Sequence, residues 1–261
     1  MLVQTLTATR YVTPLREGGS LPAVVQVDGQ EELYVMKFAG AGQGAKALVA
    51  EIIAGEIGRA LGRPVPELAL INLDPALAPN EPNEEISDLL RASVGLNLGL
   101  RFVSHAFDYN ALLRPPLDPE LASAIVWFDA YVTNVDRTAR NTNILIRQKE
   151  LWLIDHGAAL YYHHDWLNYL ERSETPCPHI KDHVLLPFAS RLEEADREAR
   201  ARLTPETLSG IMDFVPDAWL AGGPFNDPAA KRQAYLAYLA KRLAASEVFV
   251  GEARNARSLR I

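Results

Sequence analysis

The strongest constraint on the fold is a change in sequence character near the middle of the 261-residue chain. Residues 1–75 contain short runs rich in Val, Thr and Tyr, separated by glycine-containing turns, and one helical pattern. Residues 118–261 are dominated by helical patterns and contain one hairpin pattern. A run of strands followed by a run of helices is typical of the α+β class. With 48% hydrophobic residues, the chain is able to form one large domain or two small lobes.

The first half of the chain predicts an antiparallel meander followed by a helix. The helix is expected over residues 45–61, where apolar residues recur at helical spacing until Gly62 ends the pattern. A short helix is also expected over residues 84–91. Strands are expected where β-branched and aromatic residues gather between turn signals, over residues 5–15, 21–27, 33–38, 68–73 and 98–103.

The second half predicts a helical lobe that contains a single hairpin. Two short strands are expected over residues 143–147 and 151–154, on either side of a polar turn. Capping residues such as Asp118 mark the beginnings of several helices. The expected helices cover residues 118–133, 191–202, 205–214 and 228–245.

Composition excludes several classes of protein. The formal net charge is −7 and no dense Lys/Arg block occurs, so we expect no nucleic-acid partner. Cys177 is the single cysteine, which rules out an internal disulfide. No stretch of 18 apolar residues and no signal peptide are apparent, so we expect no membrane association and a cytoplasmic location.

A glycine-containing turn lies between the first two expected strands. Gly18 and Gly19 allow backbone amides to approach a phosphate closely, and Ser20 adds a hydroxyl. An ordinary hairpin turn explains the same residues when they are considered alone.

A lysine in the third expected strand and a glutamate in the following helix form the second motif. Lys37 shares a strand face with apolar residues, and an ammonium group there needs an anion. Glu51 lies 14 positions later in the helix, on a face with small residues such as Gly55 and Gly58 that allow close approach of another strand. Such a pair is suited to hold the phosphates of a nucleotide, although a solvated lysine and a solvated glutamate fit as well.

The loop 134–143 carries the most informative motif. Asp136 and Asn141 are five residues apart, a spacing that places a carboxylate near an attacking hydroxyl and an amide oxygen near Mg²⁺. Arg137 and Arg140 either neutralise phosphate charge or pair with acids, and we assign both to the nucleotide site. A capping loop rich in Asn and Asp is the alternative.

The second hairpin strand ends in Asp155, followed by His156 and Gly157. A carboxylate at a strand end beside a glycine turn is well placed to hold a metal ion that bridges two phosphates. A turn-capping aspartate is the alternative explanation.

The order of these motifs resembles that of protein kinases and, more closely, that of HipA-like kinases. The resemblance covers residues 5–165 and is carried by the glycine turn, the strand with Lys37, segments 48–51 and 64–67, the loop 134–143 and segment 154–157. It implies a two-lobed fold, with an antiparallel β-sheet and one helix in residues 1–98 and a mainly helical lobe in residues 99–261. ATP and Mg²⁺ would bind in the cleft between the lobes.

The resemblance also implies roles for individual residues. Asp136 would be the catalytic base, and Lys37, paired with Glu51, would hold the phosphates. Asn141 and Asp155 would bind Mg²⁺. The residues that would cover the phosphates are Gly18, Gly19 and Ser20.

The expected activity is ATP- and Mg²⁺-dependent phosphorylation of a protein serine or threonine. Thr138 stands where many relatives have histidine, which leaves the acceptor open. The alternatives are a small-molecule or lipid kinase, an ATP-binding pseudokinase that acts as a regulator, a nucleotidyl transferase, and a helical structural protein with chance matches. Residues 161–164, Tyr-Tyr-His-His, are expected to form an activation-type segment or a wall of the substrate site.

Overall fold

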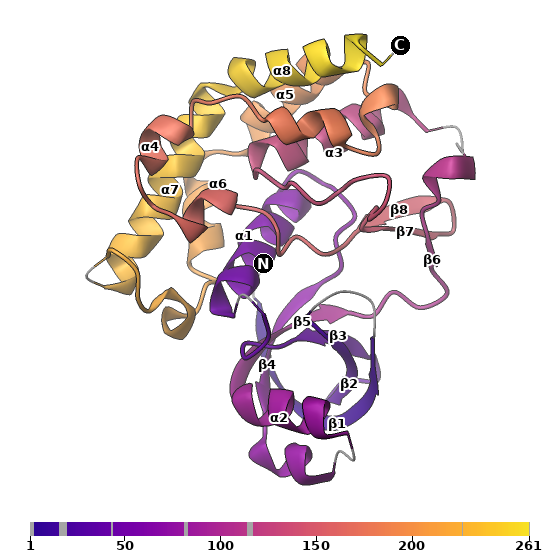
Figure 1. The fold of residues 1–261 in the computed structure, drawn as a ribbon, viewed down its shortest axis with the longest axis vertical. Helices are drawn as coiled ribbons and strands as arrows, with labels where there is room; N and C mark the ends of the chain where they lie inside the picture. The colour runs from indigo at the N-terminus through magenta and orange to yellow at the C-terminus, as the bar shows by residue number, and fades with distance from the viewer. Residues whose placement is uncertain are drawn as a thin grey trace.

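The protein has two lobes, a β-barrel and a helical lobe, as Figure 1 shows for a computed structural model. The structure describes residues 3–15, 20–42, 44–80, 83–113, 117–225 and 227–260. Among these residues, no helix has the length and hydrophobicity needed to cross a membrane. The two-lobed α+β layout agrees with the sequence prediction.

The barrel corrects the prediction of an antiparallel sheet. Its five strands close in the order β1-β2-β3-β5-β4, and one of the neighbouring pairs, β1 with β4, is parallel. Closure depends on the length of β1: residues 4–7 pair with β4, and residues 8–14 pair with β2. A barrel has no open edges for another chain to extend. The strands are β1 (Gln4–Pro14), β2 (Ala23–Val27), β3 (Tyr34–Lys37), β4 (Leu68–Leu73) and β5 (Gly95–Arg101).

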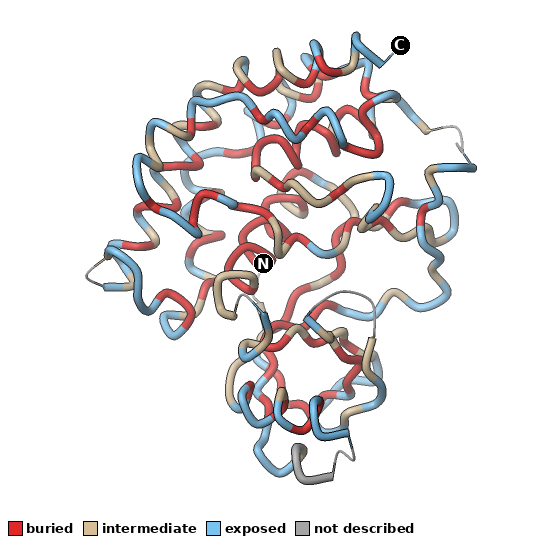
Figure 2. Tube along the Cα trace, viewed as in Figure 1, coloured by how far each residue is buried: buried red, intermediate tan, exposed pale blue. Residues whose placement is uncertain are grey.

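The barrel has its own hydrophobic core, visible as the buried inner wall in Figure 2. In β3 the alternation of strand residues places Tyr34 and Met36 inside the barrel, both buried, and leaves Val35 and Lys37 half-buried on the outer face. That outer face borders the space between the lobes. Lys37 therefore shares its strand face with the apolar residue Val35, as predicted, but this face forms the wall of a cleft rather than a closed apolar surface.

Two α-helices accompany the barrel strands, as the sequence predicts over residues 45–61 and 84–91, whereas the resemblance to kinases implies a single helix in this lobe. The second, α2 (Glu84–Ala92), begins at the side-chain cap of Asn83 and adds Ile86 and Leu90 to the barrel core. The first, α1 (Ala45–Ala60), belongs to the core of the helical lobe, and its residues 48–58 are all buried.

The small residues of α1 allow close packing, as predicted. A Cβ atom at Gly55 would lie 2.9 Å from Leu68 Cδ1, and one at Gly58 would lie 2.9 Å from Val65 Cγ2. Close packing at these two glycines fixes α1 against the segment that enters β4.

The helical lobe surrounds α3, whose buried residues form the centre of the larger core. Asp118 caps α3, as predicted from the sequence. A small sheet of order β6-β7-β8 lies beneath α3, on the side that faces the barrel (Figure 1). Its strands are β6 (Phe107–Asp108), β7 (Ile144–Arg147) and β8 (Glu150–Leu153).

The α-helices of this lobe are α3 (Pro119–Tyr131), α4 (Tyr169–Arg172), α5 (Leu192–Arg202), α6 (Pro205–Met212), α7 (Pro228–Ala244) and α8 (Ser246–Ser258). The 3₁₀ helices in the described part of the chain are η1 (Pro75–Asn80), η2 (Ala111–Leu113), η3 (Tyr161–His164), η4 (Pro178–Asp182), η5 (Leu186–Phe188) and η6 (Asp217–Leu220). The sequence prediction contained no α8, which follows α7 after one residue, Ala245, without a glycine or proline to mark a boundary.

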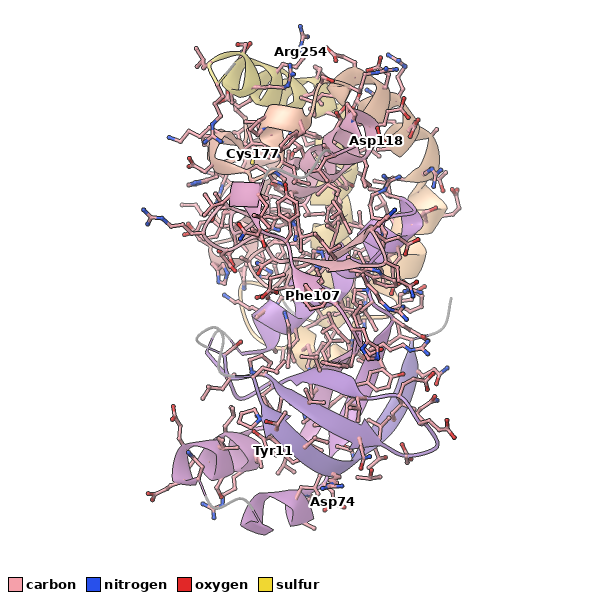
Figure 3. The ribbon with its side chains drawn as sticks, turned by 90° about the vertical axis from the view of Figure 1, so that its right-hand side faces the viewer. Tyr11, Asp74, Phe107, Asp118, Cys177 and Arg254 are labelled. Carbon is pink, nitrogen blue, oxygen red and sulfur yellow. The ribbon has the colours of Figure 1, made fainter. Side chains whose placement is uncertain are left out.

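The lobes are joined by the chain that leaves β5. The predicted boundary after residue 98 falls inside β5, so the barrel continues to Arg101. Figure 3 shows Phe107 at the level where the lobes meet, between Tyr11 in the barrel and Cys177 in the helical lobe.

The contact between Gly40 and the end of α2 provides a test of the barrel's packing. A Cβ atom at Gly40 would lie 2.7 Å from the backbone carbonyl oxygen of Ala92, so Gly40→Ala requires a backbone shift. We expect a loss of about 1–3 kcal/mol in the free energy of unfolding, measured by urea denaturation. The control is Gly210→Ala in α6, where no described atom lies within 4 Å and a small gain is expected. Equal effects of the two substitutions would contradict the packing.

Candidate active site

A cleft of about 1230 Å³ separates the two lobes and contains most of the predicted site residues. The barrel contributes Val35, Lys37 and Leu100, and the helical lobe contributes the loop after α3 and the end of β8. The predicted site residues that line it are Ser20, Lys37, Asp136, Arg140, Asn141 and Asp155. Gly18 and Gly19 lie outside the described residues.

Lys37 joins the two lobes through a pair of carboxylates. Its Nζ atom lies 2.6 Å from Glu51 Oε2 on α1 and 2.6 Å from Asp155 Oδ1 beyond β8. The Glu51 side chain is fully buried, whereas that of Asp155 is 51% exposed. The predicted pair of Lys37 and Glu51 is therefore present, and Asp155 completes a three-residue contact.

His156 holds Glu51 in place from the other side. Its backbone amide donates to Glu51 Oε2 at 2.8 Å, and its Nδ1 lies 3.4 Å from Glu51 Oε1. The imidazole is fully buried and packs edge-on against Phe128. Glu51 thus links β3, α1 and the segment after β8.

These contacts shift the pKa values of the buried pair. Burial by itself raises the pKa of Glu51, but the charge of Lys37 and the hydrogen bond from His156 outweigh burial and lower it to about 2. Burial would lower the pKa of Lys37, but the charges of Glu51 and Asp155 raise it to about 12. Both groups are therefore charged at neutral pH.

The loop after α3 presents Asp136 to the cleft. Asn141 Nδ2 donates to Asp136 Oδ2 at 2.8 Å, and Asn143 Nδ2 approaches the same oxygen at 3.4 Å. Asn143 Nδ2 also lies 3.5 Å from the backbone oxygen of Asp155. Asn143 therefore connects the loop to the Asp155 segment.

A buried acid beneath this loop fixes its shape. Asp129 on α3 accepts hydrogen bonds from Asn134 Nδ2 at 2.8 Å and from His183 Nε2 at 2.9 Å. Its Oδ2 also lies 2.6 Å from Arg137 Nε. Burial raises the pKa of Asp129, but the charge of Arg137 and the bond to His183 hold it well below its ordinary range.

Arg137 corrects one of the sequence predictions. The sequence predicts a place in the nucleotide site, but Arg137 is 1% exposed, pairs with Asp129 and donates to the backbone oxygens of Asn143 and Ile154. A guanidinium group has five N–H donors in a planar arrangement, which suits it to join several chain segments. Arg137 is a positioning residue of the loop. Arg140, in contrast, is exposed and lines the cleft.

The described residues contain no group of three or more His, Cys, Asp or Glu side chains placed to hold a metal. Mg²⁺ needs fewer protein ligands, because it keeps several waters and binds substrate phosphates. Asp155 offers an exposed carboxylate, and among the described residues none donates to the side-chain oxygen of Asn141. This donor set of hard oxygens fits Mg²⁺.

Three residues important to the geometry were not assigned by sequence reasoning: Asp129, Asn143 and His156. Asn143 and His156 lie within the predicted motifs, and their polarity was the available signal. Asp129 lies in an apolar helix, where a lone acid signals a buried partner.

Comparison with known proteins agrees with this geometry. A family model described as HipA-like kinase matches residues 12–247. The chain belongs to the HipA-like kinase family. No curated protein matches this HipA-like kinase in sequence. Among solved structures, the proinflammatory kinase CtkA of Helicobacter pylori is similar, with a TM-score of 0.58, 14% sequence identity and coverage of 100% of both chains. At that identity, the similarity to CtkA shows a common fold.

Removal of the buried charge at Asp129 tests the support of the loop. Asp129→Asn leaves the Arg137 guanidinium buried without a counter-ion, and we expect a loss of about 3–5 kcal/mol in the free energy of unfolding. The matched control is Asp88→Asn, which breaks an exposed pair with Arg91 and costs less than about 1 kcal/mol. Similar losses in urea denaturation would argue against the buried network.

Acid titration tests the pair of Glu51 and Lys37. The pKa of Glu51 is about 2 in the folded protein and about 4.3 in an unfolded chain, so its stabilisation is present above about pH 4.3 and is lost as the pH falls toward 2. We expect the free energy of unfolding of wild type to fall more steeply between about pH 5 and pH 3 than that of Glu51→Gln. Parallel curves for the two proteins would contradict the depressed pKa.

Proposed function

We propose that this HipA-like kinase binds ATP with Mg²⁺ in the cleft and transfers the terminal phosphoryl group to a serine or threonine of a protein. The observation that carries the proposal is the meeting of Lys37, Glu51, Asp136, Asn141 and Asp155 around one cleft. These residues come from both lobes and are the groups that phosphoryl transfer requires for positioning and charge stabilisation.

Lys37 would hold the nucleotide phosphates. Its ammonium group lines the cleft, and Glu51 fixes its direction from the buried side. Because its pKa is raised to about 12, the charge persists over the physiological pH range. Arg140 and Ser20 line the same cleft and would contribute further donors to the phosphates.

Asn141 and Asp155 would hold Mg²⁺. The ion, when bound, neutralises charge on the phosphates and orients them. Asp155 is suited to this role because its carboxylate is half-exposed toward the cleft while its backbone is tied to the loop by Asn143.

Asp136 would accept the proton of the acceptor hydroxyl. The amide groups of Asn141 and Asn143 both approach Asp136 Oδ2, which orients the carboxylate. An acid held in this way satisfies the geometric requirement for a general base.

The shape of the cleft favours a protein acceptor. Among the described residues, none beyond Asp155 lines the cleft, so the helical segments 165–225 and 227–260 do not enclose it. A small-molecule kinase would gain from an enclosing wall that excludes water. An open cleft leaves room for an extended segment of another protein.

Two substitutions separate binding from transfer. Asp155→Ala is expected to lose Mg²⁺-dependent ATP binding, measured by calorimetry with and without Mg²⁺. Asp136→Ala is expected to keep ATP binding and to lose phosphoryl transfer by about 10²-fold or more.

The control is Asp108→Ala, which removes another acid from the cleft wall and is expected to keep both activities. Transfer is measured as ADP release with a protein mixture as acceptor, and mass spectrometry identifies the modified residue. Wild-type transfer rates in both Asp136→Ala and Asp155→Ala would overturn the proposal. ATP binding by wild type without any transfer would indicate a pseudokinase.

A further inference from the structure

A second group of basic side chains lies outside the cleft, at the N-terminal turn of α1. The group, called the basic cluster below, consists of Lys46 on α1, His163 and His164 on η3, and Lys231 on α7. Lys46 Nζ donates to the carbonyl oxygen of His164 at 3.5 Å, and the two imidazole centroids are 4.6 Å apart. His163 Nδ1 lies 3.1 Å from the hydroxyl oxygen of Tyr235, one turn after Lys231 on the same face of α7.

No described carboxylate forms an ion pair with the basic cluster. Asp165, which follows His164, and Asp227, four residues before Lys231, each accept a hydrogen bond from a backbone amide instead. Within the described ranges, each of the two lysine ammonium groups has one carbonyl acceptor, and that of Lys231 is Gly222 at 3.2 Å. Lys231 is 3% exposed, and a cation buried in this way is costly without an anion.

His163 adds a buried polar atom without a partner. The residue is fully buried, and among the described residues none forms a hydrogen bond with its Nε2. Its other nitrogen, Nδ1, is taken by the hydroxyl group of Tyr235, so Nε2 is the nitrogen of this ring that is left for a further ligand. Burial lowers the pKa of His163 to about 3, with further contributions from the charges of His164, Lys46 and Lys231. The nearby lysine charges therefore add to the effect of burial, and His163 is neutral at physiological pH.

The beginning of α1 adds to the positive potential. Gly44 provides no side-chain cap, and the first turn of α1 contains no acidic residue. The N-terminal end of a helix carries partial positive charge, so a lysine in the first turn is unfavourable by itself. The same end becomes favourable when an anion binds to its free amides.

We propose that the basic cluster is a binding site for a phosphate-class oxyanion, supplied as free phosphate or as a phosphoryl group on a side chain of this protein. Such an anion accepts hydrogen bonds from Lys46, His164 and Lys231 at once, and reaches the unpartnered nitrogen of His163. It joins α1 to the segment that follows Asp155. Because Lys46 lies five residues before Glu51 on α1, an anion here holds the helix in the position seen in the structure.

Histidine NMR signals give a direct test that does not depend on catalysis. The full-length protein, labelled at its six histidines, is titrated with sodium phosphate against sodium chloride at equal ionic strength. We expect the signals of His163 and His164 to shift with saturation, while the signal of His156 reports separately on any phosphate in the cleft. Shifts confined to His156, or no saturable shift, would overturn the proposal.

Substitutions at accessible positions identify the donors. Lys46→Gln and His164→Gln are each expected to weaken phosphate binding about tenfold, because each removes a charge-assisted hydrogen bond. Lys181→Gln, an exposed lysine on η4, is the matched control and is expected to bind as wild type does. Thermal unfolding confirms that each variant is folded. Wild-type affinity in both Lys46→Gln and His164→Gln would refute the site.

The source of the anion is distinguished by intact mass. If the purified protein carries a phosphoryl group, the His163 and His164 signals should begin at their bound positions and move after phosphatase treatment. If it carries none and added phosphate moves them, free phosphate is the ligand. Either outcome supports the site. Both readouts are independent of catalysis, so a cleft variant that has lost ATP turnover should give the same result.

Discussion

The bond between Glu51 and Lys37 is the interaction on which the rest of the site depends. Glu51 is fully buried on α1, and its Oε2 atom accepts both the ammonium group of Lys37 from the barrel and the backbone amide of His156 from the helical lobe, while the His156 imidazole lies beside Oε1. A buried carboxylate is stable only when its lone pairs are satisfied, so the three chain segments have to meet there. The arrangement of the cleft therefore depends on the Glu51 carboxylate, because no single element provides all of its partners.

A second buried carboxylate repeats this arrangement beneath the other half of the site. Asp129 is held by Arg137, Asn134 and His183, and the chain it fixes presents Asp136 to the cleft. Each buried acid thus positions an accessible one: Glu51 supports the segment of Asp155, and Asp129 supports the loop of Asp136. The supporting acids, Glu51 and Asp129, are buried and already paired, whereas Asp136 and Asp155 line the cleft. The residues that stabilise the shape of the site are therefore different from the residues that are available for catalysis.

The sequence predicted the elements and the order of the motifs well, because both are local properties. Turn residues, alternation and helical spacing located the five barrel strands, α1 and the hairpin. Closure of the barrel through the parallel pairing of β1 with β4 was not predictable, because it depends on which distant strand covers an edge. The role of Arg137 was wrong for a related reason. Its neighbour Asp136 borders the cleft, but Asp129, eight residues earlier, offers Arg137 a buried counter-ion that spacing alone does not reveal.

The backbone at Asp155 shows where the structure places its strain. Left-handed conformation is usually left to glycine, and Gly157 lies two residues away, yet Asp155 itself has φ of 55° and Asn143 has φ of 49°. Such conformations cost about 1–3 kcal/mol each and persist only where surrounding contacts impose them. Here Lys37 holds the Asp155 carboxylate, and Asn143 approaches its backbone oxygen. The left-handed residue at Asp155 thus stands where the chain leaves β8, and its carboxylate lies in the cleft wall beside the ammonium group of Lys37.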